Sequence, residues 1–232
     1  MKLLELNITR SYKLGLLYTF VFLLLASIGN YYTWSSGPVE EVNLIFLFGW
    51  LFLYTPFFIY SIWGKWEINE FGFIVNYKTI IFIIVLLVIL SQNNDIPPIN
   101  NWNSTFIEIF ARMGEELFFR GFLYVLFLKI FNKKKKPWIG AVIISSILFA
   151  IIHTQTFLPD YENNMIDIFN MGVFLALLRK WSGSILPGAL LHILVKTFNI
   201  YGCILGIVFY LIFISVAYFI KKEKVFKFKS LT

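Results

Sequence analysis

The sequence predicts an all-α fold: a polytopic transmembrane helical bundle of about eight spans, with both termini in the cytoplasm. The first observation behind this prediction is composition, because 59% of the 232 residues are hydrophobic and only 14% are charged. Soluble globular chains average ~45–50% apolar and ~25% charged residues, so a soluble core of this size would not bury the surplus. The mean hydropathy of +0.75 agrees with lipid as the solvent of this chain.

A series of apolar runs is the second observation. A spanning helix needs ~20 mostly apolar residues. Runs near this length follow one another at 12–31, 43–63, 73–91, 105–131, 138–153, 166–181, 184–201 and 203–220. The first run has the basic start of a signal peptide, but it is long and aromatic residues follow it, so we interpret it as an uncleaved span. Residues 1–232 are therefore expected to form a single integral membrane domain.

The charges between these runs alternate, which is the third observation. Lys and Arg lie before the first run and in every second gap, at 2–13, 65, 133–136, 179–180 and 221–229. The other gaps contain no Lys or Arg, at 36–42, 92–104 and 154–165. Cytoplasmic loops of membrane proteins carry an excess of Lys and Arg. The net charge of +7 is therefore attributed to membrane topology and not to a nucleic-acid partner, and we expect a multi-pass protein of the cell membrane.

Several ionisable residues interrupt the later apolar runs. Each costs ~2.5–3.5 kcal/mol at the centre of a span on insertion scales, so a functional role is the default interpretation. The fourth run holds three carboxylates and two guanidinium groups, and later runs hold both histidines and one lysine: Glu108, Arg112, Glu115, Glu116, Arg120, His153, His192 and Lys196.

Helical spacing predicts which charged side chains of the fourth run lie on the same helix face. Glu116 and Arg120 are four residues apart and share one helix face in the favourable order. Glu108 and Arg112 have the same spacing, and Arg112 is also three residues before Glu115. Glu115 lies ~100° around the helix from Glu116. We expect Arg120 to hold Glu116 while Glu115 points into a cavity as a general base, although a purely structural ion pair also fits the first two residues.

The depths of the candidate residues agree with one another. At ~1.5 Å per residue, Glu115 lies ~16 Å along the fourth run and His192 ~12 Å along the seventh, which places both near the bilayer centre. His153 lies nearer the outer end of the fifth run. The sequence therefore predicts that one glutamate and two histidines converge in the middle to outer part of the membrane.

Three motifs on successive runs carry a family resemblance. Glu115 to Arg120 reads EExxxR, Phe149 to His153 reads FxxxH, and His192 begins a third element. In this order the motifs resemble the CPBP family of intramembrane proteases, which includes the CAAX prenyl endopeptidases and the bacterial Abi proteins linked to bacteriocin immunity. The resemblance covers about 105–200, the motif-bearing core, and implies an eight-helix membrane fold that hydrolyses peptide bonds.

The resemblance also implies a role for each motif residue. Glu115 would activate water as the general base, and His153 would hold or polarise that water. Glu116 and Arg120 would orient this group, and His192 would help to stabilise the oxyanion. The implied partners are membrane lipid and a peptide or lipid-anchored protein substrate.

One position departs from the family pattern. The third motif of the family is HxxxN or HxxxD, whereas the fourth residue after His192 is Lys196, which donates hydrogen bonds but cannot accept them. Asn199 follows on nearly the same face but ~10 Å further along the helix. Lys196 favours an alternative, a non-catalytic relative that binds a membrane partner or confers bacteriocin immunity. A proton-coupled carrier is a third hypothesis.

The same residues leave two interpretations of metal dependence. Glu115, His153 and His192 have the donor set of a catalytic zinc site with water in the fourth position. However, the sequence has no HExxH helix. We favour a glutamate-activated water without metal, and zinc is the alternative.

Overall fold

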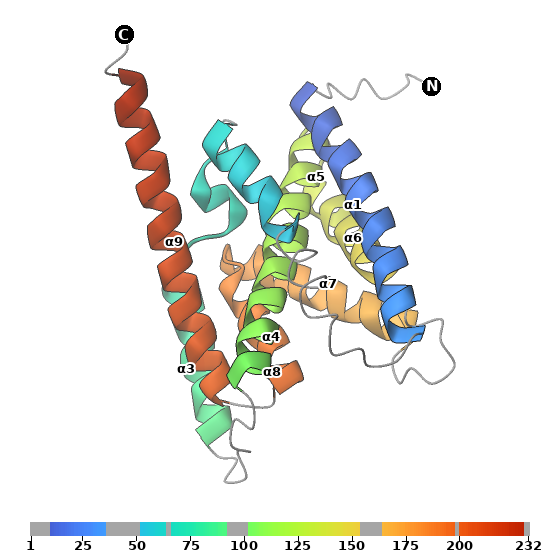
Figure 1. Cartoon of the computed structure of the whole chain (residues 1–232), viewed down its shortest axis with the longest axis vertical. Helices are drawn as coiled ribbons and strands as arrows, with labels where there is room; N and C mark the ends of the chain where they lie inside the picture. The colour runs from blue at the N-terminus through green and yellow to red at the C-terminus, as the bar shows by residue number, and fades with distance from the viewer. Residues whose placement is uncertain are drawn as a thin grey trace.

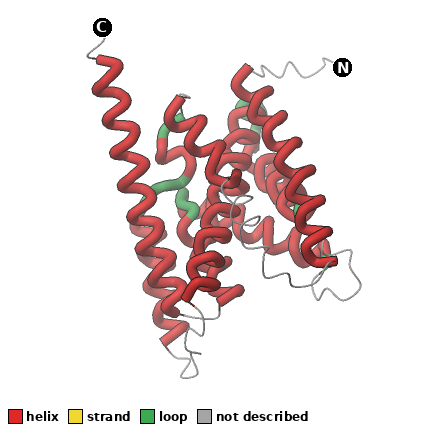
Figure 2. Tube along the Cα trace, in the orientation of Figure 1, coloured by secondary structure: helices red, strands yellow, loops and turns green. Residues whose placement is uncertain are grey.

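The computed structural model describes residues 10–35, 52–63, 66–91, 102–153, 164–197 and 200–229. Within these ranges all regular structure is helical, which confirms the all-α prediction (Figure 2). Residues 52–58 are helical and continue into η1. The other elements are α1 (Arg10–Ser35), η1 (Ile59–Trp63), η2 (Ile68–Phe71), α3 (Tyr77–Ser91), α4 (Trp102–Glu116), η3 (Leu117–Leu123), α5 (Tyr124–Ile130), α6 (Pro137–Ile151), α7 (Met165–Ser182), α8 (Leu186–Thr197) and α9 (Ile200–Lys229).

The later helices follow the predicted runs closely, and their ends have local causes. Pro137 occupies the first turn of α6, where a missing backbone N–H costs nothing. The side chain of Asn164 caps α7 by accepting a hydrogen bond from the Asp167 backbone N–H at 3.0 Å. Gly183 ends α7 with a φ of 72°, a left-handed conformation that glycine adopts without strain.

The third predicted run begins later than expected. Residues 73–76 are not helical, and α3 starts at Tyr77 because the side chain of Asn76 accepts a hydrogen bond from the Thr79 backbone N–H at 3.1 Å. The first part of the second run, 43–51, lies outside the described residues. No helix in the described part of the chain combines the length and the apolarity required of a candidate membrane span.

A continuous helix of α4, η3 and α5 forms the centre of the molecule (Figure 1). Figure 1 shows α1 on one side of it and α3 and α9 on the other. α6 packs against α5 and α7, while α8 packs against α4 and α9. The central helix is buried along η3, where aromatic side chains including Phe118, Phe119 and Phe122 fill the core. Residues on this helix are therefore held from several sides.

η3 is a π-helical segment, with hydrogen bonds that reach five residues back. The backbone N–H of Tyr124 bonds to the carbonyl of Phe119, so it no longer pairs with Arg120 as it would in an α-helix. The Arg179 side chain supplies the replacement, because its Nε donates to the Arg120 carbonyl at 3.3 Å. A Cβ at Gly121 would lie 3.0 Å from the Phe71 carbonyl, so η3 also packs closely on η2. These contacts stabilise a widened turn that an isolated helix would avoid.

Large apolar side chains cover the outside of the bundle. On α3 an exposed row consists of Ile80, Ile81, Ile84, Val85, Val88 and Ile89, each about half exposed. Similar residues lie along α1 and α9, among them Leu17, Phe20, Leu25, Ile212 and Phe219. Contiguous apolar surface of this kind marks contact with lipid or with another protein.

Candidate active site

The Glu116 and Arg120 side chains form a fully buried ion pair, as their spacing predicts. Arg120 Nη1 lies 3.0 Å from Glu116 Oε1. Arg120 Nη2 also donates to the Gly172 carbonyl of α7 at 3.3 Å, and the guanidinium lies 4.2 Å from the centre of the Phe149 ring of α6. Three helices thus fix one arginine, and through it the carboxylate of Glu116.

Gly188 of α8 allows the Glu116 carboxylate to lie directly against the helix. A Cβ at this position would be 2.7 Å from Glu116 Oε2, too close for any larger residue without displacement. Pro187 lies in the first turn of α8, where its missing N–H is tolerated. A Pro-Gly pair near the start of a helix is typical of a turn or a distortion. In the structure the pair lies within regular helix, and Gly188 makes room for the carboxylate.

Glu115 is held from the other direction by Arg112. Arg112 Nη1 donates to Glu115 Oε1 at 2.7 Å, and Arg112 Nε donates to Glu108 Oε2 at 3.0 Å. Glu115 is 7% exposed, whereas the Glu108 side chain is 36% exposed. Both predicted contacts of Arg112 therefore occur together, and its pair with Glu115 fixes one oxygen of that carboxylate.

His192 lies between the two adjacent carboxylates. Its Nε2 is 3.7 Å from Glu115 Oε2, and its Nδ1 is 3.5 Å from Glu116 Oε1. These distances exceed those of ordinary hydrogen bonds. Glu115 Oε2 and His192 Nδ1 are buried and have no hydrogen-bond partner within the described part of the chain. Because buried polar atoms are nearly always paired, these atoms indicate a place for a water molecule or a substrate group.

His153 adjoins the same site through Phe149. Its Nδ1 lies 2.7 Å from the Phe149 carbonyl, so in the neutral imidazole this nitrogen carries the proton and Nε2 is the acceptor. The Phe149 ring centre is 4.7 Å from that of His153 and 6.0 Å from that of His192. The phenylalanine of the FxxxH motif thus contacts both imidazoles and the guanidinium of Arg120.

Glu115, His153 and His192 are the residues of the zinc alternative. Such a site needs nitrogen and oxygen donors that converge at ~2.0–2.2 Å from one ion. Of the residues that the structure describes, no group of three or more His, Cys, Asp or Glu side chains is arranged to hold a metal ion. Arg112 holds Glu115, and Phe149 contacts both His153 and His192.

The structure brings Glu115, Glu116, Arg120 and His192 together, with His153 alongside. The side chain of Lys196 and the whole of Asn199 lie outside the described residues. Sequence reasoning missed the close contacts of two glycines, Gly172 and Gly188. The available signal for Gly172 was a glycine inside an apolar helical run with no turn residues beside it, which indicates close approach of a neighbouring group. Gly188 follows Pro187, a pair that is typical of a turn and so does not point to a close contact.

One comparison with known proteins finds a match. Residues 97–198 match the family model described as Type II CAAX prenyl endopeptidase Rce1-like, which confirms the family resemblance. The matched range contains Glu115, Glu116, Arg120, His153 and His192. No curated protein and no solved structure shows a significant match to the chain.

Proposed function

Because residues 97–198 match the Rce1-like type II CAAX prenyl endopeptidases, we propose that this chain is a multi-pass endopeptidase of the cell membrane. Its substrate is a peptide or a lipid-anchored protein, and it hydrolyses a peptide bond with a water that Glu115 activates. One observation carries the proposal. Glu115 Oε2 is buried, has no hydrogen-bond partner among the described residues and lies 3.7 Å from His192 Nε2, so one water beside these two atoms is within reach of both.

Two observations support the membrane location. The gaps between apolar runs alternate in charge, as expected of a chain with about eight spans and cytoplasmic termini. The exposed faces of α1, α3 and α9 are rich in Leu, Ile, Val and Phe, which suits contact with acyl chains. Membrane lipid is thus a proposed partner of the whole outer surface.

The chemistry follows from the two hydrogen-bonding partners of this water. Glu115 takes a proton from the water as its oxygen attacks the carbonyl carbon of the scissile bond. The resulting tetrahedral intermediate collapses with cleavage of the C–N bond, and the proton on Glu115 passes to the leaving nitrogen. His192 donates a hydrogen bond to the oxyanion, and preorganised donors of this kind are most effective in a water-poor site such as this one. Arg112 keeps Glu115 in position.

The other residues act by positioning. Glu116 Oε1 lies 3.5 Å from His192 Nδ1. In the proposed imidazolium form of His192, the Nδ1–H points toward this carboxylate, which Arg120 anchors, and the Nε2–H donates to the oxyanion. His153 has its Nε2 as the acceptor nitrogen and is proposed to hold the water by accepting one of its hydrogens. The mechanism therefore needs the buried ion pair for geometry and Glu115 for proton transfer.

The first experiment measures cleavage of a farnesylated fluorogenic peptide by the full-length protein in detergent. A general base contributes ~100- to 10,000-fold to the rate, so Glu115→Gln is expected to lose at least the lower value. Glu108→Gln is the matched control, because it also removes one carboxylate from Arg112 but lies outside the site. Equal rates for wild type and Glu115→Gln, with both proteins folded, would contradict the proposal.

A second variant tests the departure from the family pattern. If Lys196 supports catalysis, Lys196→Asn is expected to change the cleavage rate only a few-fold, because Asn also donates a hydrogen bond. An inert wild type that becomes active as Lys196→Asn would show that this chain has lost its peptidase activity.

A further inference from the structure

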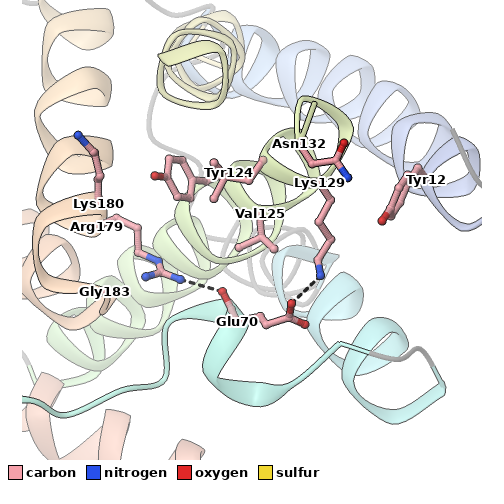
Figure 3. Close-up of a pocket in the computed structure, with 10 residues that line it drawn as sticks. Tyr12, Glu70, Tyr124, Val125, Lys129, Asn132, Arg179, Lys180 and Gly183 are labelled. Atoms are coloured by element: carbon pink, nitrogen blue, oxygen red, sulfur yellow. Dashed lines mark hydrogen bonds and ion pairs between the residues drawn. The ribbon is translucent and has the colours of Figure 1, made fainter. Parts of the chain in front are cut away.

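A second cavity lies outside the Glu115 site, near the end of the bundle where α1 begins. It has a volume of about 560 Å³, within the range of ligand pockets. The start of α1, η2 and the ends of α5 and α7 surround it (Figure 3). Its polar lining consists of Tyr12, Glu70, Tyr124, Lys129, Asn132, Arg179 and Lys180. None of these residues belongs to the proposed peptidase machinery.

Arg179 is a buried cation at the wall of this cavity. It is 8% exposed, and its Nη2 donates to the Glu70 carbonyl at 2.7 Å. Its other contacts are the Arg120 carbonyl and the ring of Tyr124, which are also neutral. No carboxylate of the described residues forms an ion pair with it. A buried charge without a counter-ion is costly, so an anion in the cavity would compensate this one.

The carboxylate of Glu70 does not supply that compensation. Its Oε1 lies 2.5 Å from Lys129 Nζ, and its Oε2 accepts the backbone N–H of Glu67 at 2.8 Å. Figure 3 shows Lys129 and Arg179 approaching Glu70 from opposite sides, one at the carboxylate and the other at the backbone. Lys180 also lines the cavity, with its Nζ 3.3 Å from the centre of the Trp138 ring. The cavity lining therefore carries three cations and one carboxylate.

We propose that this cavity binds a phosphate group. Arg179 Nε and Nη2 already donate to backbone carbonyls, so its charge and its Nη1 donor are what it offers to a phosphate oxygen, and Lys129 supplies a second charge. The Tyr12 hydroxyl and the Asn132 amide add neutral donors at the side facing α1. The cavity lies beside the exposed 133–136 lysines, on the side that the charge pattern places in the cytoplasm. Basic pockets at this level bind anionic lipid headgroups, and a soluble phosphate ester has the same chemistry.

Thermal stabilisation of the full-length protein in detergent tests the proposal. The added probes are phosphatidylglycerol, phosphatidylcholine and glycerol phosphate, each titrated to give an apparent affinity. Phosphatidylglycerol is expected to stabilise the protein and phosphatidylcholine not to do so. Lys129→Gln should weaken the binding about tenfold, the typical effect of one charge-assisted hydrogen bond. Glu70→Gln should strengthen it, because the competing carboxylate is gone while an acceptor for Glu67 remains.

Lys134→Gln is the matched control, because it removes one exposed charge from the neighbouring loop and does not line the cavity. Tighter phosphatidylglycerol binding by Glu70→Gln cannot result from misfolding. The proposal can therefore be tested even if Lys129→Gln does not fold. If glycerol phosphate stabilises the protein, and Glu70→Gln binds it more tightly and Lys129→Gln more weakly than the wild type, the bound phosphate belongs to a soluble ester. Stabilisation by phosphatidylglycerol alone would identify a lipid. Equal effects of the two lipids, or no difference between the cavity variants and Lys134→Gln, would overturn the proposal.

Discussion

At the scale of single residues, the site depends on how closely α8 approaches Glu116. Gly188 has only a hydrogen where any other residue would have a Cβ. That Cβ would lie 2.7 Å from Glu116 Oε2. Because Arg120 holds the same carboxylate from the other side, Glu116 has no alternative position without breaking the ion pair. Gly188 therefore affects the orientation of His192 indirectly, through the position of the Glu116 carboxylate.

Gly188→Ala is expected to reduce peptide cleavage about 100-fold, the usual cost of a displacement of ~1 Å at a catalytic group. The measurement is the steady-state rate with the farnesylated peptide. Gly206→Ala is the control, since its new methyl would meet only the ends of two apolar side chains, Ile193 at 2.9 Å and Leu190 at 3.4 Å. Comparable losses in both variants would indicate a general packing defect and not a role of Gly188 at the site.

The buried ion pair makes a different prediction, for stability. Arg120→Met leaves the Glu116 carboxylate buried without its cation and is expected to destabilise the protein by ~3–5 kcal/mol. Adding Glu116→Gln should restore most of that loss, because the double variant contains no uncompensated charge. Thermal unfolding in detergent measures the stability. A double variant less stable than either single variant would show that the pair does not interact as described.

At the scale of elements, η3 determines where the site groups point. Because its hydrogen bonds reach five residues back, the Arg120 carbonyl has no partner from this turn and accepts a hydrogen bond from Arg179. A helix 59 residues later in the chain therefore stabilises the widened turn.

Arg179→Lys keeps the charge but loses the two guanidinium nitrogens that donate to the carbonyls of Arg120 and Glu70. We expect a loss of ~1–3 kcal/mol, the cost of leaving a buried carbonyl unpaired. Thermal unfolding measures it, with Lys134→Gln as the surface control, and a loss no larger than that of the control would contradict this role.

The sequence predicted the helices from apolar runs near the length of a span, and it predicted the Glu116–Arg120 and Glu108–Arg112 pairs from their spacing. It did not predict the π-helical turn, because η3 is buried and apolar around nearly its whole circumference and so has no amphipathic pattern to set its register. The buried position of Arg179 was also missed, since a cation at the end of an apolar run has the same pattern as an ordinary cytoplasmic flank. Both features depend on tertiary contacts that no local pattern records.

At the scale of the whole molecule, the two ends of the described chain lie at the same end of the bundle, on opposite sides of it. Figure 1 shows the start of α1 and the end of α9 at the same end of the bundle, as an even number of crossings requires. The end of α5 lies toward this end as well (Figure 1), and the lysines at 133–136 follow it. The proposed topology therefore agrees with the arrangement of these helices.

Cysteine labelling tests this topology in intact cells. In a Cys203→Ser background, Lys134→Cys is expected to react with an impermeant maleimide only after the membrane is opened. Asp167→Cys, in the first turn of α7, should react from outside. Both positions are exposed, so differences in burial do not explain a difference in reactivity. Labelling of both residues from the same side would contradict the multi-pass arrangement.

The π-helical turn also limits how this protein can change in length. Glu115 and Glu116 precede η3 and Arg120 lies within it, so one residue removed from 117–119 would rotate the arginine by ~100° relative to the carboxylates. One residue removed after Arg120 would restore ordinary helical pairing and turn α5 away from α6. A substitution in this segment changes only the packing around one side chain. An insertion or deletion rotates all the following residues of the central helix relative to those before it. Homologous chains are therefore expected to vary in the identity of these residues but to keep their number.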